Sequence, residues 1–453
     1  MAPEMMTEEG VHRVQRRTVV LLAAAQVFGG IGTGATVSIG SILAVELSGS
    51  SAWAGAVATI MTLGAALAAL PLAALAERRG RRSGQVTGLS AALAGTVLMV
   101  LSVVTGVFVL LVLGAAGIGV GTAASLQARF AAVDLAGQEH RGRALSIVVW
   151  AVTVGAVAGP NLIQPGTAVG AALGLPPVAG PFVISGAGLL VAVLLVLAGL
   201  RPDPLLLARE LAASAEARLP GTPPPGLPLP ASQAAGRTPG ALVRGMRAIR
   251  SSRGALLAVA AVVAAHAVMV GVMSMTPLHL QHLVEGQGAS HAGHIASGDV
   301  LVIIGFTISL HIAGMFALSP LMGWLTDKTG RTETIMIGCA LLIAAVLVAG
   351  FGEGSTAAVA VGLVLLGMGW SAATVSGSTL LAESVGQESR VVVQGVSDML
   401  MGAAGAVGGA ISGLVLSWTG YLGLNMLGGV VGASVLAAAF LARVGGRRQS
   451  AAA

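Results

Sequence analysis

The stretch GWLTDKTGRT at Gly323–Thr332 has a counterpart in AALAERRGRR at residues 73–82. In both stretches an apolar run ends at an acidic residue followed by a basic one, and a glycine followed by Arg precedes the next apolar run. Glu77 and Asp327 occupy the corresponding acidic positions, 250 residues apart. The same charged turn between two apolar segments therefore occurs once in each half of the chain.

Two further matches lie in the same register. DLAGQEHR at Asp134–Arg141 corresponds to ESVGQESR at Glu383–Arg390, and GAVAGP at Gly155–Pro160 corresponds to GAVGGA at Gly405–Ala410. Three matches at nearly one offset indicate a duplicated unit. Parallel repeats of this kind, related by an axis along the membrane normal, are typical of one large class of secondary transporters.

The composition predicts a helical membrane protein. The chain has 453 residues, of which 55% are hydrophobic and 9% charged, whereas soluble domains have about 25% charged residues. A hydrocarbon core of roughly 30 Å needs about 20 apolar residues per helix, and helices satisfy their own backbone hydrogen bonds there. The sequence predicts twelve spans, at 18–47, 52–76, 84–104, 107–131, 144–164, 180–200, 254–283, 300–326, 334–352, 356–382, 391–418 and 420–442.

The 24 Lys and Arg residues all fall on one side of this pattern, in the N-terminal stretch, in alternate connections and in the C-terminal stretch. Short cytoplasmic loops retain positive charge. We therefore expect a multi-pass protein of the plasma membrane with both termini in the cytoplasm. The uncleaved first span is too long for a signal peptide.

The predicted organisation has five parts. A cytoplasmic N-terminal tail at 1–17 precedes a six-helix bundle at 18–200, and a second bundle at 254–442 precedes a tail at 443–453. The cytoplasmic linker at 201–253 between the bundles holds eight Arg and a run with six Pro at residues 219–230. Dense proline favours extended chain. A short basic amphipathic helix at 239–252 is expected to lie on anionic lipid.

These features resemble the major facilitator superfamily, whose loop signature is G-x-L-a-D-R-x-G-R-K. The second half matches it at Gly323, Leu325, Asp327, Lys328, Gly330 and Arg331. The first half keeps Leu75, Ala76, Arg78, Gly80, Arg81 and Arg82, with Ala73 in place of Gly and Glu77 in place of Asp. The resemblance implies an all-α membrane protein with two pseudo-symmetric six-helix bundles around a central cavity.

The resemblance also implies a gate. A carboxylate at the cytoplasmic end of one helix can bind the positive N-terminus of a facing helix. By analogy with the family, Glu77 is expected near Arg390 at the start of helix 11, and Asp327 near Arg141 and Ala144 at the start of helix 5. These contacts would hold the cytoplasmic side closed. The alternative is a pair of solvated turns.

Gly155, Gly159 and Pro160 resemble the family's antiporter motif, G-x-x-x-G-P-x-x-G-G, although the trailing glycines are replaced. Small residues four apart let helix backbones approach closely, and proline removes a helix hydrogen bond. We expect a pliable interface between the halves here, which favours export by exchange. Ordinary Gly/Ala packing is the alternative.

A few ionisable residues lie within or beside the predicted spans. Charges at bilayer depth are costly and usually serve substrate or proton handling. The candidates for proton coupling or substrate contact are Asp398, His266, His311, Arg129 and Asp134. The alternatives are interhelical hydrogen bonds for the histidines, gate pairing for Asp398 and an interfacial anchor for Arg129.

The sequence therefore predicts a monomeric secondary transporter in the lipid bilayer that exports a small organic molecule in exchange for protons. Uptake by proton symport is the second interpretation, and a non-transporting receptor is a third. A transition-metal exporter is a further alternative, because His279, His282, His291 and His294 gather in one outer connection. No phosphate-binding loop, enzyme motif, cofactor site or nucleic-acid domain is visible in the sequence.

The topology is testable by cysteine labelling in a background that lacks Cys339. Cysteines at Ser50 and Gln287 should react with an impermeant thiol reagent outside intact cells, and a cysteine at Ser232 should not. Labelling at Ser232 in intact cells would contradict the orientation.

Overall fold

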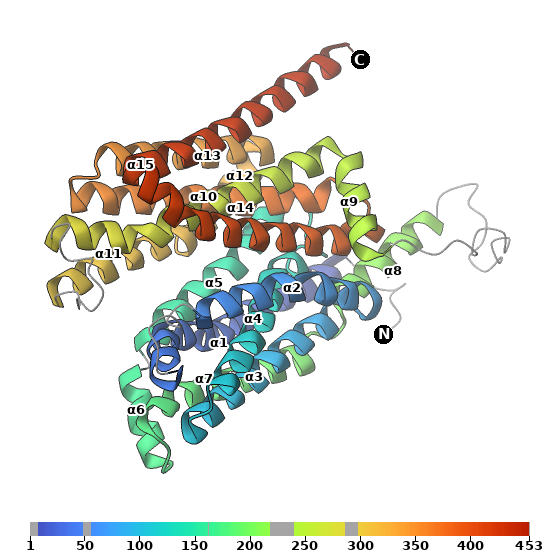
Figure 1. Ribbon diagram of the computed structural model, residues 1–453. Coiled ribbons are helices and arrows are strands. Elements are labelled where there is room, and N and C mark those ends of the chain that lie inside the picture. The colour runs from blue at the N-terminus through green and yellow to red at the C-terminus, as the bar shows by residue number, and fades with distance from the viewer. Residues whose placement is uncertain (1–7, 49–55, 162, 218–239, 286–297, 453) are drawn as a thin grey trace.

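A computed structural model describes residues 8–48, 56–161, 163–217, 240–285 and 298–452 (Figure 1). Every regular element in these ranges is an α-helix or a short 3-10 turn. The fold is the all-α arrangement of two six-helix bundles that the sequence predicts, with the N-terminal bundle below and the C-terminal bundle above in this view.

The N-terminal bundle contains seven helices in the described residues. This is one more than the six predicted spans, because a short helix, α6, follows the helix of the fifth span. They are α1 (Glu8–Ser48), α2 (Ala56–Arg79), α3 (Arg81–Thr105), α4 (Phe108–Ala131), α5 (Arg141–Asn161), α6 (Ile163–Ala172) and α7 (Gly180–Gly199). Two 3-10 turns, η3 (Gln138–His140) and η4 (Pro177–Ala179), precede α5 and α7.

The C-terminal bundle is built from α10 (Arg253–Glu285), α11 (Gly298–Phe316), α12 (Ser319–Thr329), α13 (Arg331–Phe351), α14 (Thr356–Glu383) and α15 (Gln387–Ala452). Helices α11 and α12 share the span predicted at 300–326, and the break falls just before Pro320, which cannot donate a backbone hydrogen bond. α15 holds two predicted spans, which Gly420 separates with φ 71° and ψ −175°.

Nine helical stretches among the described residues are long and apolar enough to cross a membrane, and the longest, Gln387–Val444, includes the reversal at Gly420. The chain is therefore a multi-pass membrane protein. Its terminal helices extend into the predicted tails, because α1 begins at Glu8 and α15 reaches Ala452.

The linker is more helical than its composition suggested. α8 (Pro204–Ala217) and α9 (Ala241–Ser251) flank the proline-rich run, which lies outside the described residues. The apolar side of α9 packs on α15: Ile249 is 3% exposed and joins a cluster that includes Val392 and Val396. The side of α9 that carries Ile249 is therefore covered by the protein, whereas Leu242, Val243, Arg247 and Arg250 are exposed. Contact of this exposed side with anionic lipid stays a prediction.

The two bundles approach each other at the end that carries α8 and α9, at the right of Figure 1, and separate towards α6 and α11. We call the first end the linker end. Helix α5 contacts α12 and α2 contacts α15 across the halves. At Gly142 on α5, an added Cβ would lie 2.6 Å from the carbonyl oxygen of Gly323 on α12. Only glycine permits this approach.

Gly155 has a different role from the one expected. An added Cβ there would lie 2.6 Å from the carbonyl oxygen of Val27 and 2.7 Å from the Cα of Gly30, both on α1. Gly155 therefore packs α5 within its own bundle, and not against the other half. Gly159 and Pro160 continue α5, but the surroundings of their side chains lie outside the described residues.

Candidate functional site

The second-half loop binds the opposite half through Asp327. This residue lies near the end of α12, and its carboxylate accepts hydrogen bonds from the backbone N–H groups of Gly142 and Arg143, each at 2.9 Å. Those groups are in the first turn of α5, where they have no partner within the helix. The negative charge also lies at the positive end of the helix dipole.

Glu383, at the end of α14, forms a second link between the halves. It accepts from Arg331 at 3.0 Å and from Arg141 at 3.3 Å, and Arg331 also donates to the carbonyl of Gln138 in the other half. Lys328 lies 4.6 Å from the ring centroid of Trp324 and so makes a cation–π contact. Gly330 has φ 109°, which suits glycine at the turn.

The first-half loop is held differently. Glu77 accepts two hydrogen bonds from Arg244 on α9, at 3.0 and 2.9 Å, and Arg209 on α8 donates to its carbonyl at 2.7 Å. The hydrogen bond with Glu77 raises the pKa of the Arg244 guanidinium. Among the described contacts Glu77 has no ion pair with Arg390, so the expected partner is replaced. The cause is the docking of α9 on α15, which places Arg244 over the loop.

Asp203 completes this arrangement, and the sequence analysis did not single it out. Its carboxylate accepts from the backbone N–H of Arg82 at 2.8 Å and from that of Leu205 at 3.0 Å. It therefore caps both α3 and α8. Gly80, with φ 89°, forms the turn beside it, and Arg78 is exposed. An Asp directly before Pro204 is a helix-start signal that could have revealed it.

Arg81 lies in a buried polar network at the linker end. The residue is 2% exposed, pairs with Asp134 at 2.8 Å and donates to the side-chain oxygen of Gln394 at 2.6 Å. Asp134 belongs to the first half and Gln394 to α15 of the second. Arg81 thus joins the halves through a residue, Gln394, that the sequence analysis missed because an isolated glutamine carries no pattern.

Arg129 on α4 and Asp398 on α15 form a buried ion pair across the two halves. Their side chains are 3% and 0% exposed. The Arg129 guanidinium also lies 4.7 Å from the ring centroid of Phe130. Nε of Arg129 and Oδ2 of Asp398 have no hydrogen-bond partner in the described part of the chain. The pair is therefore enclosed but incompletely satisfied.

The two histidine candidates occupy different surroundings. His266 on α10 accepts a hydrogen bond from the Trp370 indole at 3.1 Å, and the Trp370 ring meets Phe316 edge-on at 5.6 Å. His311 on α11 is fully buried and bonds through Nδ1 to the carbonyl of Leu363 on α14 at 2.7 Å. This geometry is that of an interhelical hydrogen bond, the alternative weighed for His311.

The outer histidines do not form a metal site in the described residues, where no group of three or more potential ligands is present. His279 instead bonds to the carbonyl of Glu353 at 2.8 Å and stacks on Tyr421 with 3.9 Å between ring centroids. His291 and His294 lie outside the described residues.

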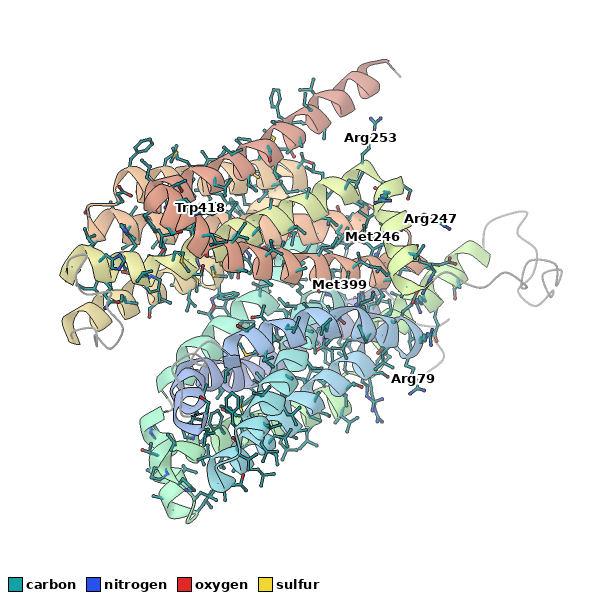
Figure 2. The ribbon with its side chains drawn as sticks, in the orientation of Figure 1. Arg79, Met246, Arg247, Arg253, Met399 and Trp418 are labelled. Carbon is teal, nitrogen blue, oxygen red and sulfur yellow. The ribbon has the colours of Figure 1, made fainter. Side chains whose placement is uncertain are left out.

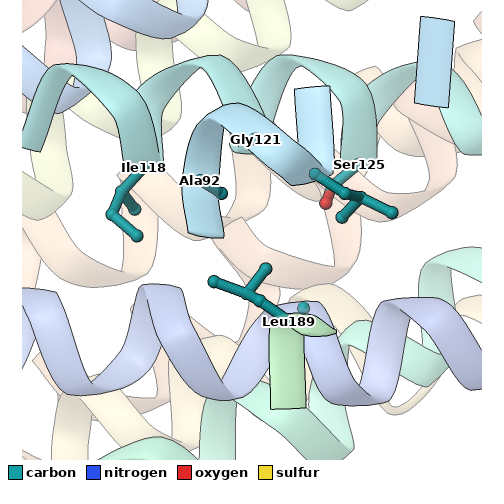
Figure 3. A pocket seen from close by; sticks show the side chains of 7 residues that line it. Ala92, Ile118, Gly121, Ser125 and Leu189 are labelled. Atoms are coloured by element: carbon teal, nitrogen blue, oxygen red, sulfur yellow. The ribbon is translucent and has the colours of Figure 1, made fainter. Parts of the chain in front are cut away.

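Two hollows lie within single bundles. A small one in the N-terminal bundle is lined by Ala92, Ile118, Gly121, Ser125, Leu189, Gly29 and Leu89 (Figure 3). A groove of about 460 Å³ runs between α10 and the two segments of α15, and its lining is apolar apart from Ser412. Neither lining includes a charged residue, so both differ chemically from the ion pairs that join the halves.

Two apolar helical bundles that meet through buried charges at one end define a membrane carrier of the secondary-transport class. The family model of the Major Facilitator Superfamily matches residues 22–303 and 294–452. The chain belongs to this superfamily, and it is a transporter and not an enzyme.

Three relatives match along nearly the whole chain. The MFS-type transporters YddS and YdeG of Bacillus subtilis (strain 168) are 34% and 32% identical, over 93% and 92% of this chain and 90% and 89% of theirs. The riboflavin transporter RfnT of Brucella anthropi is 27% identical over 91% of this chain and 92% of its own.

Solved structures share the fold. The human organic anion transporter MFSD10 (TETRAN) gives a TM-score of 0.66 at 15% identity, covering 94% of this chain and 99% of its own. FucP in the outward conformation gives 0.62 at 16% identity, covering 93% and 98%.

The Glu77–Arg244 contact can be measured by a double-mutant cycle. Glu77→Gln and Arg244→Gln should each lower the melting temperature of the purified protein. The double variant should lower it by less than the sum of the two single effects. Because Arg244 is 38% exposed, the coupling should be roughly 0.2–1 kcal/mol. Arg247→Gln is the matched control, since Arg247 points away from the bundles on the same helix (Figure 2). Strictly additive effects would contradict the pairing.

Proposed function

We propose that this transporter exports a small organic compound in exchange for protons by alternating access. The observation that carries the proposal is the Arg129–Asp398 pair, because it joins the two halves, is buried and includes a group that can be protonated. A small organic substrate is also supported by RfnT, which is named for riboflavin.

The coupling follows from the cost of separating buried charges. When the linker end opens, residues on α4 and α15 move apart, and each charge loses its partner. Leaving one buried charge unpaired costs about 3–5 kcal/mol. A proton on Asp398 removes its negative charge and therefore lowers the cost of opening. In this way the protonation state of one carboxylate can bias a two-state equilibrium.

The direction of transport rests on the sequence. The likeness of Gly155–Pro160 to the antiporter motif favours exchange and hence efflux. Uptake by symport is the second candidate. The same ion pair favours uptake when the substrate is an anion. A proton on Asp398 frees Arg129, so an anionic substrate on Arg129 and the proton would bind together.

The gate of this transporter comprises the contacts at the linker end. Three sets of contacts link the halves directly: Asp327 of α12 with the first turn of α5, Glu383 with Arg331 and Arg141, and Arg81 with Gln394. The positive charge of the linker supports the assignment of this end, and of both termini, to the cytoplasm. We place the protein in the plasma membrane as a monomer, with its substrate site open alternately to the two sides.

Asp327→Asn should impair transport more than folding. The variant loses a carboxylate at a helix N-terminus, an interaction worth roughly 0.3–2 kcal/mol, so the population should shift towards the state open at the linker end. Spectroscopic distances between labels on α5 and α12 should lengthen, while the melting temperature changes little. Unchanged distances together with full transport would count against the gate.

Asp398→Asn should abolish movement driven by a proton gradient and leave passive exchange. The measurement is transport of a substrate panel in proteoliposomes with an imposed pH gradient, whose sign also separates efflux from uptake. His266→Gln and His311→Gln are the comparison variants, and we expect His311→Gln to lower stability rather than coupling. Wild-type accumulation and pH dependence in Asp398→Asn would assign the proton to another group.

A further inference from the structure

Helix α14 carries five buried hydroxyl residues in three turns, and they fall into two groups. Ser376 and Thr379 donate to the carbonyls four residues earlier, at 2.5 and 2.8 Å. The hydroxyls of Ser371, Thr374 and Ser378 have no hydrogen-bond partner among the described residues, although these residues are 0–1% exposed. We call these three residues the α14 hydroxyl face.

Their spacing places the three residues on one side of the helix. At 3.6 residues per turn, steps of three and four return to the same face. Gly369 marks the opposite side, because an added Cβ there would lie 2.9 Å from the carbonyl of Gly338 on α13. Gly377 marks the side towards α10, where the added Cβ would lie 2.7 Å from Val262. The hydroxyl face is thus turned away from α13. Gly367, one turn before Ser371 on the same side, packs on α11, because an added Cβ there would lie 2.5 Å from the carbonyl oxygen of His311. Helix α14 also contacts α12 of its own half and α5 of the other half.

Folding alone does not account for these unpaired groups. A buried hydroxyl without a partner costs about 1–3 kcal/mol, and a serine in a helix can avoid this cost by bonding to the carbonyl four residues back. Ser376 and Thr379 do so on the same helix. The hydroxyls of Ser371, Thr374 and Ser378 can therefore find hydrogen-bond partners in another conformational state of the carrier.

We propose that Ser371, Thr374 and Ser378 line the translocation path, where they bind water and the uncharged hydrogen-bonding groups of the substrate once the linker end opens. The face begins beside Trp370, the partner of His266, and continues towards Glu383 of the gate. It therefore connects the centre of the molecule with the linker end. The substrate that fits it carries hydroxyl, carbonyl or amide groups. This inference rests on alternating access as proposed above.

The test is thiol accessibility in a background that lacks Cys339. Single cysteines replace Ser371, Thr374 and Ser378, with Ser376 and Thr379 as matched controls on the same helix. Inside-out vesicles expose the linker end to methanethiosulfonate ethyltrimethylammonium, with and without Asp327→Asn. Cysteines on the hydroxyl face should react at least about tenfold faster than the controls, because only a hydrated thiol ionises readily. Asp327→Asn should widen this difference.

Equal rates at all five positions, or faster labelling of the controls, would overturn the inference. Melting temperatures of the five variants establish that each is folded. Labelling needs water access and conformational exchange but no proton gradient. Wild-type proton coupling in Asp398→Asn would therefore overturn the proposed coupling role of Asp398 and leave the labelling pattern unchanged.

Discussion

The whole structure depends on one constraint: polar groups at bilayer depth must find partners inside the protein. The backbone meets it by forming helices, and glycines such as Gly142 and Gly323 let those helices approach within van der Waals contact. The charges meet it by pairing. Arg81 with Asp134 and Arg129 with Asp398 are buried pairs, and both lie where the halves meet. The same requirement thus explains both the close packing of the helices and the buried ion pairs between the bundles.

Duplication produced two similar loops, but the structure uses them differently. Asp327 caps a helix of the opposite half directly, while Glu77 binds Arg244 of the linker helix α9. The longer side chain of Glu suits a side-chain partner better than a helix end, and α9 in turn packs on α15 through Ile249. The linker therefore fastens the first-half loop to the second half. A segment between repeats has become part of the contact that the repeats make.

The contacts between the halves differ in how fully they are buried. Partly exposed pairs such as Glu383 with Arg331 are worth little singly. Among the described residues, the enclosed Arg129–Asp398 pair retains two unsatisfied atoms and the α14 hydroxyl face retains three. Incomplete satisfaction is costly in a rigid protein, but it is what a carrier needs if water or substrate completes the bonds in its other state.

The sequence by itself determined the membrane class, the helical fold and the repeat, because hydropathy, positive charge and the loop signature are local patterns. It also placed Asp327 in a loop that could face the start of α5, since the family motif specifies that residue. It did not determine that Glu77 binds Arg244, that Gly155 packs on α1, or that Asp203 and Gln394 take part. Those partners lie on segments far apart in the chain, and only the docking of α9 and the approach of the two bundles brings them within hydrogen-bonding distance.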